Sequence, residues 1–156
     1  MKKNKIIIFG ASGQIGIDLV NYFSEYSYDV ICVSTKQIPQ RFKKIKNIKW
    51  YNLNFKNYKK INMKDVKFAI NCTGIHSFSK FNQLDDYIDT NILIVNEIIK
   101  IIKNKCFKRL YHLSTISKYD MNSQTIIDEN SKLSFNTNYS ITKTLSDASV
   151  FSFPVI

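Results

Sequence analysis

Short apolar runs alternate with segments of helical periodicity along this chain. The apolar runs, each bounded by glycine or polar residues, predict five strands at residues 6–9, 30–33, 49–53, 68–72 and 109–114. Apolar residues at helical spacing predict helices over 14–25, 87–103 and 139–151, the last with low intrinsic propensity because it is rich in Ser, Thr and β-branched residues. Residues 36–49 and 118–138 are expected to be mostly loop.

This alternation is typical of the α/β class, in which strands pair in parallel through right-handed crossovers. We therefore predict a Rossmann-type doubly wound parallel sheet in three layers, forming a single domain over residues 1–156. Ligands of such sheets bind beyond the carboxyl ends of the strands. Here those ends form one rim that consists of Gly10, Ser34, Asn52, Cys72–Thr73–Gly74 and Ser114–Thr115.

Three glycines follow the first predicted strand and open the first helix. In a dinucleotide site the first glycine makes the tight turn, and the later ones let backbone and helix come close. The free N–H groups and the positive dipole end of the helix then bind the diphosphate. The glycine spacing recurs by chance in loops, but a strand before it and a helix after it is the context that confirms the motif. The sequence therefore predicts a dinucleotide cofactor on Gly10, Ser12, Gly13, Gln14, Ile15 and Gly16.

A second constellation lies near the end of the chain. Tyr139 and Lys143 are four residues apart, so a helix places both on one face. A cation beside a phenol stabilises the phenolate, and such a tyrosine can exchange a proton with a substrate hydroxyl. An isolated pair of this spacing is usually a surface pair. Here Thr115, after the fifth strand, offers a rim hydroxyl to the same substrate oxygen.

Composition and charge narrow the classes of protein. The chain is 44% apolar, which suits a globular domain, and no apolar run reaches the ~20 residues of a membrane span. The net charge of +11 comes from lysines scattered through every segment, so we expect no specific nucleic-acid binding. Three cysteines and two histidines stand far apart, which predicts no metal site. A cytoplasmic location without membrane association is expected.

Taken together, these segments resemble the extended short-chain dehydrogenase/reductase family, the NAD(P)-dependent epimerase and dehydratase group that acts on nucleotide sugars. The resemblance covers residues 5 to about 147 and rests on several motifs, none of which is specific alone. The motifs are residues 10–16, residues 71–74, Asn91, residues 112–119, and Asp128–Glu129 ahead of Tyr139 and Lys143.

The resemblance implies hydride exchange between NAD(P) and a hydroxyl or carbonyl substrate, such as a nucleotide sugar. Tyr139 would be the acid/base, Lys143 would favour its phenolate and bind the nicotinamide ribose, and Thr115 would hold the substrate oxygen. The cofactor would further contact the ends of strands two to four and the long helix, at Ser34, Thr35, Lys36, Asn52, Leu53, Cys72, Thr73, Gly74 and Asn91.

Two departures from the family pattern sharpen these expectations. Members that prefer NAD usually carry an acid at the end of the second strand, whereas this chain has Ser34, Thr35 and Lys36, which predicts a preference for NADP. Ile116 and Ser117 follow the rim hydroxyl where a dehydratase usually has an acid, so epimerisation or carbonyl reduction is expected ahead of dehydration.

The family's members typically run to roughly twice this length, beyond the usual single-domain size. We therefore expect a chain without the C-terminal substrate lobe, either the incomplete N-terminal part of a longer enzyme or a half-enzyme completed by another chain. The apolar tail at residues 151–156 would favour homo-oligomers. The alternative to an enzyme is a binding module, a truncated pseudoenzyme that holds NAD(P) without turnover.

Overall fold

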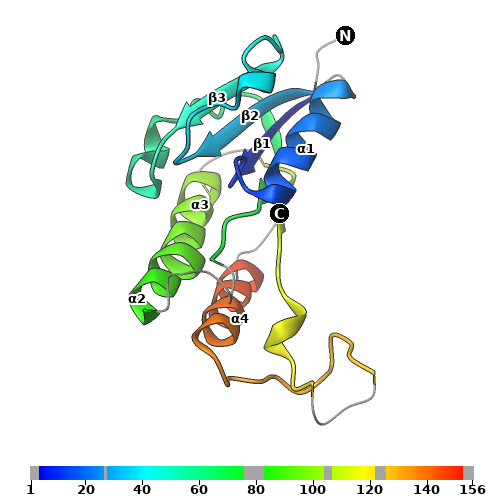
Figure 1. Cartoon of the computed structure of the whole chain (residues 1–156), viewed down its shortest axis with the longest axis vertical. Helices are drawn as coiled ribbons and strands as arrows, with labels where there is room; N and C mark the ends of the chain where they lie inside the picture. Colours follow the sequence, from blue (N-terminus) through cyan, green and yellow to red (C-terminus); the bar gives the residue numbers. More distant parts are fainter. Residues whose placement is uncertain (1–3, 27, 76–82, 104–106, 122–125, 153–156) are drawn as a thin grey trace.

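A five-stranded parallel sheet with the strand order β3–β2–β1–β4–β5 organises the fold, and its strands β1, β2 and β3 are labelled in the upper part of Figure 1. It is seen in a computed structural model that describes residues 4–26, 28–75, 83–103, 107–121 and 126–152. The strands are β1 (Lys5–Phe9), β2 (Asp29–Ser34), β3 (Ile48–Asn52), β4 (Val66–Asn71) and β5 (Arg109–His112). The predicted α/β class and parallel Rossmann-type sheet are confirmed.

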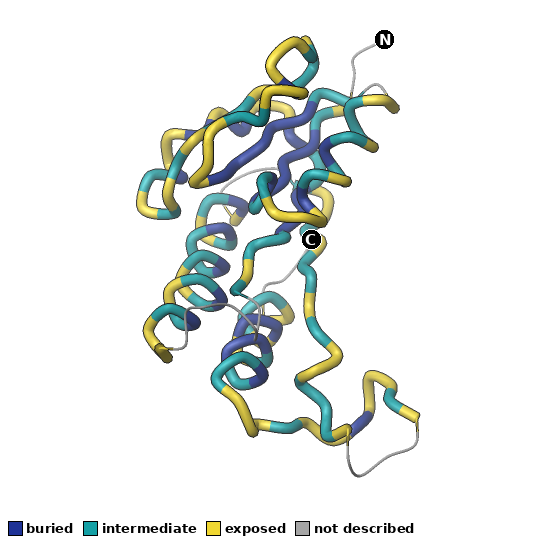
Figure 2. Tube along the Cα trace, in the orientation of Figure 1, coloured by how far each residue is buried: buried dark blue, intermediate teal, exposed yellow. Residues whose placement is uncertain are grey.

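Two apolar clusters cover the two faces of this sheet. One face packs Ile7 and Phe9 of β1 against Ile98 and Ile102 of α3 (Ile94–Lys103). The other packs Ile6 and Ile8 against α1 (Gln14–Glu25), which contributes Val20. Because side chains alternate between the faces of a strand, the consecutive apolar residues of β1 supply both clusters. Figure 2 shows the resulting buried centre.

The long helix predicted over residues 87–103 is continuous but starts earlier and changes its winding. It begins as α2 (Leu84–Tyr87), passes through the π-helical segment η3 (Ile88–Leu93) and continues as α3. A π-helical turn adds a residue to the turn and often lies at a functional site. Here it contains Asn91, which is 1% exposed.

The end of β5 and the helix after it depart slightly from the predicted bounds. β5 ends at His112, two residues earlier than predicted, and η4 (Ile116–Lys118) is a 3₁₀ turn that leads into the expected loop. Helix α4 (Asn138–Phe151) begins one residue early, with a capping box between Thr137 and Ser140. This box explains how a segment of low helical propensity forms a regular helix. α4 packs against η3 and α3.

Two further 3₁₀ segments occupy stretches without apolar periodicity. The segment η1 (Gln40–Phe42) interrupts the expected loop, and η2 (Phe55–Lys60) was not predicted. Lysines surround Tyr58 in η2, yet its ring packs 5.2 Å from that of Phe9, and burial raises the pKa of Tyr58 to about 12. A single buried ring in a lysine-rich stretch leaves no periodic signal.

Several sequence expectations lie outside the described residues, namely those on His76, Cys106 and residues 153–156. Within the described part of the chain, no helix is long and apolar enough to cross a bilayer.

Candidate functional site

The turn after β1 is closed too tightly for any side chain at two positions. Gly10 has φ +78°, and its N–H and that of Ala11 both donate to the carbonyl of Val33 at 3.0 and 3.1 Å. A Cβ on Gly16 would lie 2.2 Å from the carbonyl oxygen of Gly10. Since real Cβ atoms do not approach backbone so closely, α1 packs onto the turn only because residue 16 is glycine.

The first turn of α1 is left open to a ligand. Gly13 is its N-cap and supplies no side-chain cap, and the first turn contains no acidic residue. The first N–H groups of a helix lack intrahelical partners, and the dipole makes this end positive. Gln14 and Ile15 are exposed there. The residues present therefore fit the diphosphate of a dinucleotide, which needs backbone donors and a close approach.

Two serines tie the glycine turn to the end of β2. Ser34 donates from its Oγ to the Oγ of Ser12 at 2.6 Å and accepts from the N–H of Lys36 at 2.9 Å. The indole of Trp50 donates to the carbonyl of Lys36, which fixes that backbone while the side chain stays exposed. Thr35 is also exposed. An ammonium and two hydroxyls thus lie at the position where the resemblance expects a carboxylate.

The ends of β3 and β4 continue the same rim. Asn52 is exposed, whereas Leu53 is half-buried and donates its N–H to the carbonyl of Ser34 at 2.8 Å. The N–H of Cys72 donates to the carbonyl of Phe9 at 2.9 Å, and burial raises the pKa of the Cys72 thiol to about 11. Cys72 therefore has the properties of a neutral packing residue.

Asn91 holds the segment after β4 against α4. Its Oδ1 accepts from the N–H of Ile75 and its Nδ2 donates to the Oγ1 of Thr142, both at 3.0 Å. A Cβ added to the exposed Gly74 would lie 3.5 Å from the same Oδ1. The structure therefore gives Asn91 a bracing role beside the rim, and its predicted contact with a cofactor stays a prediction.

Helix α4 presents the predicted Tyr/Lys pair at the β5 end of the rim. Lys143 is 4% exposed, and its Nζ donates to the carbonyl of Leu113 at 2.6 Å. Burial lowers the pKa of Lys143, Asp147 opposes this shift and Lys118 adds to it. Tyr139, one turn earlier, is half-buried, with its ring 6.4 Å from that of Tyr87.

Thr115 lies two residues beyond the carbonyl that Lys143 binds. Its Oγ1 accepts from the N–H of Ser117 at 3.2 Å and so begins η4. Beside it is a cavity of about 480 Å³. The cavity is lined by Ser114, Thr115, Ile116, Lys118, Tyr119, Ile127, Asp128 and Glu129. A pocket with hydroxyls, carboxylates and an ammonium suits a polar, hydroxyl-rich substrate.

A buried network behind Lys143 was missed by the sequence analysis, which treated His112 as an isolated residue. The ring Nδ1 of His112 lies 2.9 Å from the Nδ2 of Asn71, and its Nε2 lies 3.4 Å from Asp147. Asp147 also accepts from Lys118 at 2.6 Å and from Ser114. These residues lie 29 to 41 positions apart in the pairs that touch, so no local pattern marks them. The Lys143-to-Asp147 spacing of one helical turn was the available signal.

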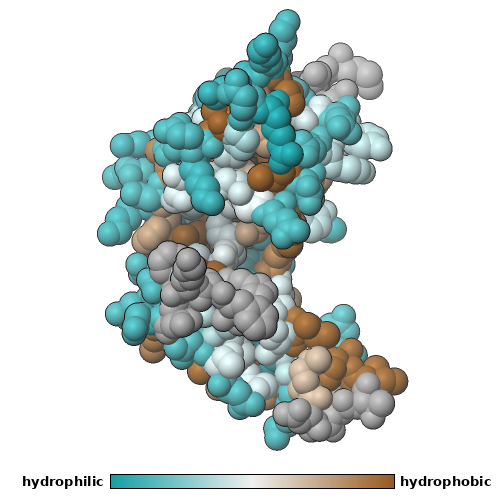
Figure 3. Space-filling model, viewed as in Figure 1, coloured by the Kyte–Doolittle hydropathy of each residue, from teal (hydrophilic) through white to brown (hydrophobic). Residues whose placement is uncertain are grey.

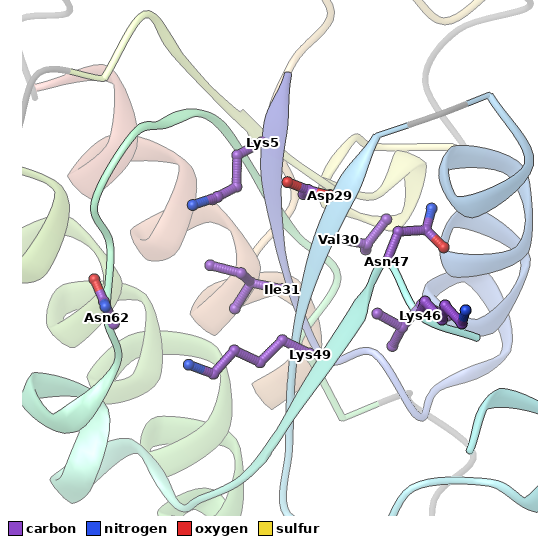
Figure 4. Close-up of a pocket in the computed structure, with 9 residues that line it drawn as sticks. Lys5, Asp29, Val30, Ile31, Lys46, Asn47, Lys49 and Asn62 are labelled. Atoms are coloured by element: carbon purple, nitrogen blue, oxygen red, sulfur yellow. The ribbon is translucent and has the colours of Figure 1, made fainter. Parts of the chain in front are cut away.

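The glycine turn thus follows the central strand β1, whereas the Tyr/Lys helix lies against the segment after the edge strand β5, close to Thr115 in the chain. A different cavity, of about 260 Å³, lies at the amino ends of β1, β2 and β3. Figure 4 shows Lys5, Lys49 and Asn62 on one side of these strands and Lys46 and Asn47 on the other. None of the predicted site residues lines it.

Exposed apolar side chains gather over the loop between η4 and α4. Figure 3 shows this patch at the lower right of the molecule. The exposed large apolar residues that the structure describes between η4 and α4, with η4 included, are Ile116, Met121, Ile126, Leu133 and Phe135.

The comparisons with known proteins agree with this geometry. The model of the NAD dependent epimerase/dehydratase family matches residues 6–153. A comparison with curated proteins finds no match.

Solved structures of similar fold include a UDP-N-acetylglucosamine 4-epimerase from Methanobrevibacter ruminantium M1 in complex with UDP-N-acetylmuramic acid (TM-score 0.86, 18% identity, 98% of this chain and 51% of that chain). The enzyme WbmG of Bordetella bronchiseptica in complex with NAD is similar with a TM-score of 0.85 and 15% identity over 99% of this chain and 51% of that one. The UDP-glucuronic acid 4-epimerase of Bacillus cereus, in complex with UDP-glucuronic acid and NAD, is similar with a TM-score of 0.82 and 19% identity. This match covers 96% of this chain and 52% of that one. The chain therefore spans about half the length of these structures.

Proposed function

The chain belongs to the NAD-dependent epimerase/dehydratase family, and on this ground we propose that its sheet rim binds NAD(P) and serves hydride exchange with a hydroxyl or carbonyl substrate. A nucleotide sugar is the substrate class we propose, because two of the solved structures of similar fold hold UDP-sugars. The diphosphate would lie on the first turn of α1, where the N-cap Gly13 supplies no side-chain cap and where Gly10 and Gly16 let the helix pack closely onto the turn.

The observation that carries the proposal is the buried Lys143 at the carboxyl end of β5. An ammonium is costly to bury, so a lysine in this place needs a reason. It has three N–H donors, of which the carbonyl of Leu113 takes one. The others are suited to the hydroxyls of a nicotinamide ribose, and the charge favours the phenolate of Tyr139 one turn away.

The proposed chemistry divides between the cofactor and three side chains. The bound nicotinamide supplies the hydride acceptor or donor. Tyr139 takes the proton from the substrate hydroxyl, or returns it, and Thr115 orients the same oxygen with its hydroxyl. The cavity beside Thr115, with Asp128 and Glu129 on its wall, receives the polar part of the substrate.

We further propose that NADP is preferred over NAD. A carboxylate at the end of β2 would repel a 2′-phosphate, and Ser34, Thr35 and Lys36 stand there instead. Calorimetric titration of both cofactors tests this, and equal or tighter binding of NAD⁺ would overturn it. Lys36→Met should weaken NADP⁺ binding about tenfold and leave NAD⁺ unchanged, since one lost ion pair to phosphate is worth about 1.4 kcal/mol. Lys44→Met, another exposed lysine, is the matched control.

Turnover is tested with Tyr139→Phe, which keeps the ring and removes the proton. On a mixture of UDP-sugars, wild type should form product with NAD(P) while Tyr139→Phe binds the cofactor equally and forms none. If Tyr139→Phe lost both turnover and cofactor binding, the hydroxyl would instead have a structural role.

A second candidate is a cofactor-binding module without turnover. Tight NAD(P) binding with no product from any UDP-sugar, in wild type as in Tyr139→Phe, would support this candidate.

A further inference from the structure

Asp147 occupies an unusual place on the helix that carries the proposed acid/base pair. Tyr139, Lys143 and Asp147 follow one another at intervals of four, so they share one face of α4. Among the described residues, Asp147 is the one buried carboxylate and Lys143 the one buried lysine.

The carboxylate of Asp147 holds the segment that leads into Thr115 and follows it. Its Oδ2 accepts from the Nζ of Lys118 in η4 at 2.6 Å and from the Oγ of Ser114. Its Oδ1 lies 3.4 Å from the Nε2 of His112, at the end of β5. Three contacts from residues 112–118 thus converge on one carboxylate, which fixes that segment against α4.

The hydrogen bonds of Asn71 decide the tautomer of His112. The N–H of Thr73 can only donate, so the Asn71 atom that it contacts at 3.0 Å is the oxygen. The amide nitrogen of Asn71 therefore faces the Nδ1 of His112, which accepts. The proton of the ring lies on Nε2, toward Ser146 and Asp147.

The charges around Lys143 can then be counted from every element packed against it. Asp147 on α4 and Lys118 on η4 are the charged groups that act on it, and β5 contributes the carbonyl of Leu113. Lys118 is paired with Asp147, and its side chain is 13% exposed. Without Asp147, the charge of Lys118 would act on Lys143 with no carboxylate to oppose it, and the more buried Lys143 would lose its proton more easily.

We propose that Asp147 is a positioning residue that neutralises Lys118 and so keeps Lys143 protonated for the cofactor ribose and Tyr139. The inference rests on the proposed function for its purpose, but its physical content concerns only the three charged groups. Lys118 is accordingly the source of the repulsion, and removing it should make Asp147 dispensable to the charge state of Lys143.

The test is a double-mutant cycle of Asp147→Asn and Lys118→Met, read out on Lys143 itself. The titration of Lys143 is followed by NMR of ¹³C-labelled lysine, its signal being identified by its loss in Lys143→Met. Asp147→Asn should lower the titration midpoint by about one pH unit, or tenfold in proton affinity. Lys118→Met alone should raise it, and the double variant should return it to within about twofold of wild type. Asp147→Glu, which retains the charge, should stay close to wild type.

A purely structural role predicts a different pattern. In that case the double variant would be as perturbed as Asp147→Asn, or Lys118→Met would leave the midpoint unchanged, and either result overturns the proposal. If Asp147→Asn does not fold, the direction of the shift in Lys118→Met still decides the matter.

The same variants are then titrated with NADPH between pH 7 and 10. Asp147→Asn should lose affinity at a lower pH than wild type, with recovery in the double variant. If wild type binds no NADPH, the proposed function fails, whereas the NMR titration still decides the role of Asp147.

Discussion

The glycine turn and the β5–α4 region of the rim are held by different kinds of interaction. Residues 10–16 carry no charged side chain, and backbone hydrogen bonds and the lack of room for a Cβ define their shape. The β5–α4 region instead gathers Lys143, Asp147 and Lys118 out of water. The glycine turn offers a ligand oriented N–H dipoles. The β5–α4 region instead holds charged side chains, and these must neutralise one another. Shape therefore governs the glycine turn, and electrostatics governs the β5–α4 region.

The largest effect is expected from Gly16→Ala, which disrupts the packing of the glycine turn. Its Cβ would meet the carbonyl of Gly10 at 2.2 Å, and neither backbone segment can move without opening the turn. We expect a loss of about 4 kcal/mol in the free energy of unfolding and no measurable NAD(P) binding. Urea unfolding and calorimetry measure the two effects.

Gly74→Ala is the matched control for this substitution. Its Cβ would lie 3.5 Å from Asn91, which is an ordinary contact, so a change below about 0.5 kcal/mol is expected. If the two variants were equally stable, the shape of the first turn would not depend on glycine.

The same contrast explains what the sequence could predict. The glycine turn is local, since strand, glycines and helix follow within some twenty residues, and its geometry follows from residue types alone. The strands and the parallel sheet were predicted for the same reason. The bracing role of Asn91 and the His112–Asp147 cluster depend on contacts across the fold, with partners up to 51 positions away. No periodicity encodes such pairings, so the sequence singled out Tyr139 and Lys143 on α4 but neither Asp147 nor the partners of these residues.

Removing the carboxylate of the β5–α4 region should lower the free energy of unfolding somewhat less than Gly16→Ala does. Asp147→Asn leaves Lys118 unpaired in a poorly solvated place, and we expect a loss of about 3 kcal/mol at pH 7. Burial alone would raise the pKa of Asp147, but the nearby His112 ring and the hydrogen bonds from Lys118 and Ser114 hold it well below its ordinary value.

This depressed pKa fixes the pH dependence of that loss. A carboxyl group whose folded pKa is depressed stabilises the fold above its unfolded value, about 3.9, and loses that contribution as the pH falls through the folded value. The difference between wild type and Asp147→Asn in urea unfolding should therefore be full at pH 7 and shrink below about pH 4. A difference independent of pH would contradict the ionised pair.

Asn91→Ala tests the uncharged contact that holds the segment after β4 against α4. It would leave the N–H of Ile75 and the hydroxyl of Thr142 without their amide partner in a buried place, which costs about 2 kcal/mol. Asn57→Ala removes an exposed side-chain hydrogen bond to Asn54 and should change the stability by less than about 0.5 kcal/mol. Thermal unfolding compares them, and equal effects would show that burial of the Asn91 amide has no consequence.

The smallest expected effect has the opposite sign. Burial lowers the pKa of Lys143, so the fold favours the neutral amine more than the unfolded chain does. The charged side chain therefore costs stability below the folded pKa, and this cost disappears as the pH rises through that value toward the unfolded one. Lys143→Met should stabilise the chain by about 1 kcal/mol at pH 7 and weaken NAD(P) binding, whereas Lys100→Met, at an exposed ion pair, should change neither appreciably. A destabilised Lys143→Met would mean that the hydrogen bond to Leu113 outweighs the cost of burying the charge. A stabilised variant that no longer binds NAD(P) would mean that the charged end of the rim is kept for its ligand, at the expense of the fold.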